Sequence, residues 1–154
     1  FPHHTFNDGP IYGYVKDGEI LALVKTHHAN WIIERLPGKA GHLLTTLLPY
    51  LPWIKRIINP KKHDFLVFES LWFKEGNDAI VEPLMEGVLH SEQRNTAIWW
   101  VDTLDPIYLK LKPQISWGLL HKLNGISKVN LVVKSNNKEI QLNGPFFITG
   151  FDFV

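Results

Sequence analysis

Residues 64–102 read DFLVFESLWFKEGNDAIVEPLMEGVLHSEQRNTAIWWVD, and this stretch decides the fold because it contains a complete strand, loop, helix and strand. Its first part, residues 65–73, is apolar and aromatic except at Glu69 and Ser70. Such a run is typical of a strand that is covered on both faces. The residues at 74–78 then supply turn-forming Gly, Asn and Asp.

An amphipathic helix follows this turn and leads to a second apolar strand at residues 96–101. A connection of this length through a helix makes the two strands parallel. Ligands of open α/β sheets bind at the carboxyl ends of such strands, so we expect function at residues 74–78 and 102–108. The helix is predicted to end near His90, and its apolar face consists of Ile80, Val81, Leu84, Met85, Val88 and Leu89.

Length and composition indicate one ordinary globular domain. The 154 residues include 16 Lys and Arg against 15 Asp and Glu, so no strong positive field favours nucleic acid as a partner. The absence of Cys excludes disulfides, thiolate metal sites and a Cys nucleophile. We also expect no metal site, because the adjacent His3 and His4 do not provide three converging ligands.

Neither a membrane-spanning segment nor a signal peptide is evident in the sequence. No apolar run approaches the roughly 18 residues of a spanning helix, and the start lacks a basic and then apolar signal pattern, so we expect a cytoplasmic protein. The chain begins at Phe1 without Met, so we expect it to be one part of a longer protein. The alternative is a chain that assembles with copies of itself.

The N-terminal third is predicted to be an extended segment over residues 1–10 followed by an antiparallel hairpin. Two β-rich runs, at residues 11–15 and 20–24, flank an Asp17-Gly18 turn, which is among the strongest short-range hairpin signals. The second strand is expected to continue through residues 31–33. His27 and His28 within it are interpreted as exposed imidazoles at a twist or bulge.

Residues 39–62 combine apolar helical spacing with Pro residues and a basic end. We interpret them as a helical excursion packed on the sheet, with Lys and Arg reaching water. The alternative is a membrane-surface segment over residues 47–62.

The last third is predicted to begin with a helix and to end in strands. Asp105 is a typical helix N-cap and Pro106 a typical first helical residue. Apolar residues continue the helical pattern as far as residue 123, after an interruption at Pro113. A second hairpin is expected over residues 129–142, followed by β-rich residues 146–154.

This order of elements resembles the GNAT N-acetyltransferase superfamily from its second strand to its last. The resemblance is carried by residues 14–20 for the central hairpin, 65–76 for the fourth strand and the pyrophosphate loop, and 96–108 for the fifth strand and the next helix. It implies an α/β (α+β) fold with a mixed central sheet and flanking helices, forming a single domain over residues 11–154. The family's first strand and first two helices would then precede Phe1.

The resemblance also implies an N-acyltransferase that takes acetyl-CoA or another acyl-CoA as donor and a small-molecule or peptide amine as acceptor. Glu69 would be the general base, directly or through water, and Tyr108 would protonate the departing thiolate. The backbone amides of Leu71 and Phe73 would contact pantetheine and the acyl carbonyl, if the fourth and fifth strands splay into a cleft. The remaining cofactor contacts would come from the loop residues Lys74, Gly76, Asn77 and Asp78.

Two residues of this loop depart from the family pattern. Gly76 matches, but Phe73 stands where the family has a cationic or amide side chain, and Asp78 stands where it has a small residue. A carboxylate directed at a diphosphate weakens its binding. Three readings follow: an active acyltransferase, a degenerate GNAT-like domain that binds a ligand or partner without turnover, and a membrane-associated domain.

Overall fold

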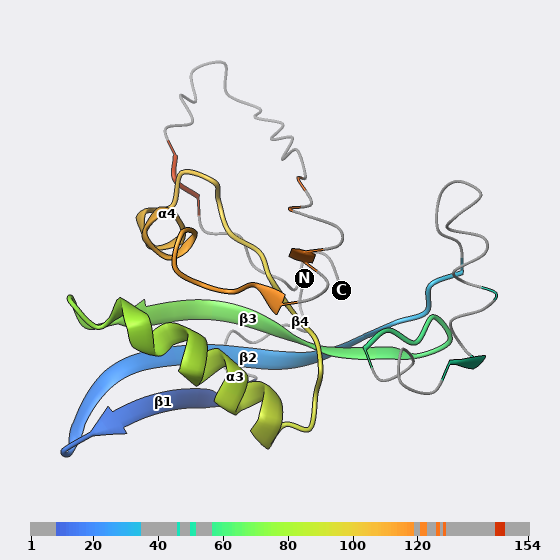
Figure 1. The fold of residues 1–154 in the computed structure, drawn as a ribbon, viewed down its shortest axis with the longest axis horizontal. Helices are drawn as coiled ribbons and strands as arrows, with labels where there is room; N and C mark the ends of the chain where they lie inside the picture. The colour runs from blue at the N-terminus through green and yellow to red at the C-terminus, as the bar shows by residue number, and fades with distance from the viewer. Residues whose placement is uncertain are drawn as a thin grey trace, which may run out of the picture. The chain divides into compact units, whose positions relative to one another are not determined.

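The computed structural model describes residues 9–34, 46, 50–51, 57–118, 121–122, 126, 128 and 144–146 (Figure 1). The described residues up to Trp100 form one compact unit, and those within Val101–Phe147 form a second. The predicted hairpin at 129–142, the closing β-rich stretch apart from Phe146, and most of residues 39–56 lie outside the described residues. So does most of the first ten residues.

The first unit is built on a four-stranded mixed sheet with the strand order β1-β2-β3-β4 (Figure 1). β1 pairs with β2 and β2 with β3 in antiparallel fashion, while β3 and β4 are parallel, as the sequence predicted. The fold is therefore of the mixed α/β class. The strands are β1 (Ile11–Lys16), β2 (Glu19–Trp31), β3 (His63–Phe73) and β4 (Ala97–Trp99).

The β1-β2 hairpin forms where Asp17-Gly18 predicted it. Asp17 has φ 52° and Gly18 has φ 80°, the two positive values that a tight two-residue hairpin turn requires. β2 then runs without interruption to Trp31, so the single long strand includes His27 and His28. His28 is exposed as expected, but His27 is buried.

β3 forms the centre of the core. Phe65, Leu66 and Val67 are fully buried, which confirms that both faces are covered along the first half of the strand. Trp72, near the other end, has 48% of its surface exposed, so the expectation that the strand is covered on both faces does not hold there. The core continues into α3 (Val81–Ser91), which buries Val81, Leu84, Met85 and Val88 and contacts β1 and β2.

The start of α3 explains how Pro83 is accommodated. A short 3-10 turn, η2 (Asp78–Ile80), precedes the helix, and α3 itself begins at Val81. Pro83 therefore lies in the first turn, where backbone N–H groups have no partner within the helix. The proline removes no helical hydrogen bond.

The end of α3 is closed by a left-handed residue. Gln93 has φ 53°, its N–H donates to the carbonyl oxygen of His90 at 3.1 Å, and the N–H of Arg94 donates to that of Leu89 at 2.9 Å. These two bonds form a Schellman motif. The chain then enters β4, which is shorter than the predicted strand at 96–101.

The second unit contains α4 (Pro106–Leu111), whose start was predicted from Asp105-Pro106. One carboxylate oxygen of Asp105 accepts from the N–H groups of Ile107 at 2.7 Å and Tyr108 at 3.1 Å. Asp102 accepts from two N–H groups with its two different oxygens, Oδ1 from Leu104 at 2.8 Å and Oδ2 from Phe146 at 3.0 Å. These two hydrogen bonds lower the pKa of Asp102. Within the described residues, no helix has the length and apolar character needed to cross a membrane.

Candidate functional site

A β-bulge interrupts β3 at the two polar residues within its apolar run. Val24 pairs with Leu71 and Thr26 pairs with Phe68, so two residues of β3, Glu69 and Ser70, lie opposite Lys25 alone. Such a bulge bends the strand and turns its side chains relative to a regular ladder. Glu69 and Ser70 therefore lie where the geometry of the strand changes.

The pairing between β3 and β4 ends at the same bulge. Their pairing extends only from Leu66 with Ala97 to Phe68 with Trp99. β3 then continues to Phe73, and no described strand pairs with this part on the side of β4. Among the described strands, β3 therefore has no partner on this side beyond Phe68, the residue before Glu69.

Backbone amides of β3 point to this side of the strand. The N–H of Lys74 donates to the carbonyl oxygen of Leu21 in β2 at 2.8 Å. Because successive backbone groups of a strand alternate between its two edges, the N–H groups of Phe73 and Leu71 point away from β2. These are the two amides that the sequence predicted as cofactor contacts.

Glu69 is buried and is paired with a histidine that sequence reasoning did not select. Its Oε1 lies 3.6 Å from Nδ1 of His27 in β2, and the two side chains are 5% and 10% exposed. A carboxylate in such a position can act as a general base. The one visible signal for this site was Glu69 itself, the single carboxylate in the apolar run 65–73.

Several polar groups of the loop after β3 have partners in the loop or in the β1-β2 hairpin. Lys74 forms an ion pair through Nζ with Glu19 in the hairpin. The N–H of Asn77 donates to the carbonyl oxygen of Lys74 at 3.0 Å, and its side-chain amide donates to that of Glu75 at 3.3 Å. Gly76 adopts φ 79°, a conformation that glycine accommodates without strain.

The charge of this loop does not suit a diphosphate. Glu75, Asp78 and Glu82 place three carboxylates on the loop and the first helical turn, while its one cation, Lys74, already pairs with Glu19. A helix N-terminus favours anions, but these carboxylates oppose a second anion there. The charges of this loop therefore do not favour the binding of a diphosphate.

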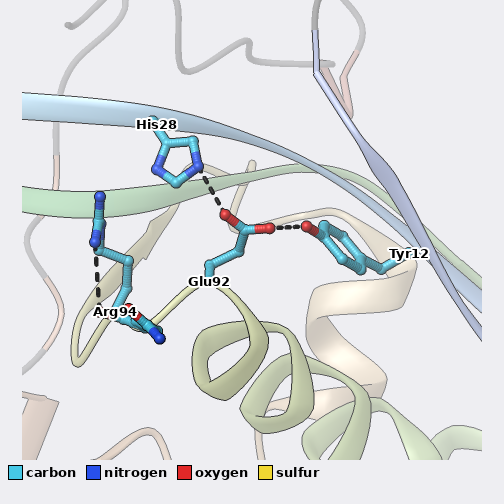
Figure 2. Close-up of polar contacts among 5 residues, drawn as sticks. Tyr12, His28, Glu92 and Arg94 are labelled. Atoms are coloured by element: carbon cyan, nitrogen blue, oxygen red, sulfur yellow. Dashed lines mark hydrogen bonds and ion pairs between the residues drawn. The ribbon is translucent and has the colours of Figure 1, made fainter.

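A separate polar cluster anchors the end of α3 to the sheet. Figure 2 shows the carboxylate of Glu92 between His28 and Tyr12. Nε2 of His28 lies 2.8 Å from Oε2 of Glu92, and the hydroxyl of Tyr12 donates to the other oxygen. An open groove of about 220 Å³ borders Tyr12, and it is lined by Tyr12, Gly13, Tyr14, Pro83, Leu84, Gly87 and Val88.

Tyr108, the predicted acid, belongs to the second unit. It is buried, its ring centroid lies 6.4 Å from that of Trp117, and Nζ of Lys112 lies 5.9 Å from it. Its neighbours within that unit thus include an aromatic ring and a cation. In the described part of the chain, no group of three or more His, Cys, Asp or Glu side chains could hold a metal ion.

Comparisons with protein-family models, with curated proteins and with solved structures found no match for this chain. The class that its fold defines is a mixed α/β sheet with a parallel strand pair that opens beside a buried carboxylate.

Proposed function

We propose that this protein is a GNAT-like N-acyltransferase that transfers an acyl group from an acyl-CoA thioester to an amine. The observation that carries the proposal is the opening between β3 and β4, which begins beside the buried Glu69. An extended thioester arm can lie along such an edge and hydrogen-bond to the backbone of Leu71, as an added strand would.

The chemistry assigned to Glu69 is that of a general base. Its carboxylate takes a proton from the ammonium group of the acceptor, and the resulting amine attacks the thioester carbonyl carbon. The C–N bond forms, the C–S bond breaks, and the thiolate leaves with the electron pair of the C–S bond and is then protonated. The N–H of Leu71 or Phe73 would stabilise the negative charge that develops on the carbonyl oxygen.

The alternative is a degenerate GNAT-like domain that binds a ligand or a partner without turnover. The acidic loop favours this alternative, because Glu75 and Asp78 repel the diphosphate that gives acyl-CoA donors much of their affinity. Both proposals share the opening in the sheet, so they differ only in what occupies it and whether an amine reacts there.

Calorimetry with acetyl-CoA and with S-acetyl-pantetheine tests the site. We expect both thioesters to bind with dissociation constants within about tenfold of each other, because the loop contributes little. Asp78→Asn should strengthen acetyl-CoA binding without changing the affinity for S-acetyl-pantetheine. The matched control is Glu86→Gln, which removes an exposed carboxylate from α3 outside the loop. The proposal is contradicted if neither thioester gives a heat of binding at millimolar concentration.

Turnover separates the enzyme from the degenerate domain. Release of free thiol from acetyl-CoA is measured across a panel of primary amines and lysine-containing peptides. Glu69→Gln should lower thiol release at least about 100-fold while leaving acetyl-CoA affinity nearly unchanged. An equal loss of both shows that Glu69 is structural, and binding without thiol release from any amine favours the degenerate domain.

A further inference from the structure

β1 is the outermost of the described strands of the sheet. No strand in the described part of the chain pairs beyond it. Ile11 and Val15 are 66% and 58% exposed, and Lys16 at its end is the one charged residue of the strand. Proteins usually protect such an edge with charges, bulges or a covering segment, and an uncovered apolar edge pairs readily with another strand.

The hydrogen-bond pattern identifies the groups on this edge. The N–H of Thr26 in β2 donates to the carbonyl oxygen of Pro10 at 3.1 Å. Backbone groups alternate along a strand, so Tyr12 and Tyr14 bond inward to β2. The backbone groups of Ile11, Gly13 and Val15 therefore point outward.

We propose that a second copy of this chain pairs with β1 in antiparallel fashion, about a two-fold axis at Gly13. In this register Ile11 faces the partner's Val15, and Gly13 faces the partner's Gly13. The outward backbone groups of the two strands then coincide, which allows roughly six new hydrogen bonds. A continuous sheet of two copies results.

The sequence of β1 is self-complementary in this register. Residues 10–15 carry no charge, so no like charges meet across the axis, and Lys16 faces the partner's Pro10. At each end of the pairing, Ile11 of one copy faces Val15 of the other, and both residues are β-branched and apolar. Each Tyr12 lies across from the partner's Tyr14. An unrelated extended peptide would lack this matching of both ends, which is why we assign the edge to a second copy.

Sedimentation velocity across a dilution series tests the assembly. A short edge interface predicts a dimer with a dissociation constant on the order of 10–100 µM. Val15→Lys should abolish the dimer, whereas Ile32→Lys should leave it intact. Ile32 is the matched control, because it is 73% exposed but lies outside β1. A monomer at about 1 mM, or equal loss in both variants, overturns the proposal.

Disulfide formation tests the register. The chain has no Cys, so a single introduced thiol reports one distance. Facing residues of a hydrogen-bonded antiparallel pair have Cα atoms about 5.5 Å apart, which a disulfide spans. Gly13→Cys should therefore crosslink, because the tight contact of the added Cβ is with the tip of the Leu23 side chain at 3.1 Å, and the carbonyl oxygen of Ala22 is at an ordinary 3.8 Å.

The register control is Val15→Cys. In the proposed dimer this residue lies about 13 Å from its own copy, too far for a disulfide. We expect Gly13→Cys to crosslink at least about tenfold faster under mild oxidation. Equal rates for the two variants, or faster crosslinking of Val15→Cys, overturn the two-fold register.

Discussion

The buried pair of Glu69 and His27 gives the sharpest test of how the candidate site is built. The side chains approach at 3.6 Å with 5% and 10% of their surfaces exposed. Removing one partner of a well-formed buried ion pair costs about 3–5 kcal/mol. The separation here exceeds hydrogen-bond length, so we expect Glu69→Leu and His27→Leu to cost less, about 1–3 kcal/mol each.

The double variant separates pairing from simple packing. If the carboxylate and the imidazole stabilise each other, the double variant is less destabilised than the sum of the single variants by at least about 1 kcal/mol. Urea unfolding of the four proteins at neutral pH measures this coupling. Additivity within about 0.3 kcal/mol would show that the two groups do not act as a pair, and His27 would then lose any role in holding the proposed base.

Three further predictions concern the framework of the site. Tyr12→Phe removes the hydroxyl that donates to Glu92 and should lower the free energy of unfolding by about 0.5–1.5 kcal/mol in urea titrations. Gln93→Gly relieves a side chain held at φ 53° and should raise that free energy by about 0.5–1 kcal/mol; a decrease would contradict the left-handed cap. Burial lowers the pKa of His63 below its usual 6.5, so protonation favours the unfolded chain, and stability should fall as the pH drops below about 6.5. In thermal melts, the stability of His63→Gln should fall less at low pH than that of the wild type. His90→Gln, which changes an exposed histidine, should lose as much stability as the wild type.

Local signals predicted much of the framework correctly. The Asp17-Gly18 turn, the Asp105 cap and the parallel pair of β3 and β4 all appear where the sequence placed them. Each depends on the conformational preference of a few neighbouring residues or on the length of one connection, which can be read without knowing the rest of the chain.

The candidate site could be predicted only in part. Glu69 stood out as a carboxylate in an apolar run, and the resemblance suggested the amides of Leu71 and Phe73. The pairing with His27 could not be read, because the two residues meet only through the register of β2 against β3. That register includes a bulge, and one extra residue in a strand changes which side chains share a face.

Within the described residues, the amino-acid sequence by itself thus determined the β1-β2 hairpin, the strand-helix-strand unit of β3, α3 and β4, and the start of α4, because hydrophobic periodicity and turn chemistry act over short distances. The tertiary structure alone decided where β4 stops pairing, that the bulge falls at Glu69 and Ser70, and that Lys74 is held by Glu19. These features arise from contacts between segments far apart in the chain. Their geometry depends on how whole strands align, so the opening beside Glu69 becomes visible only when the sheet is assembled.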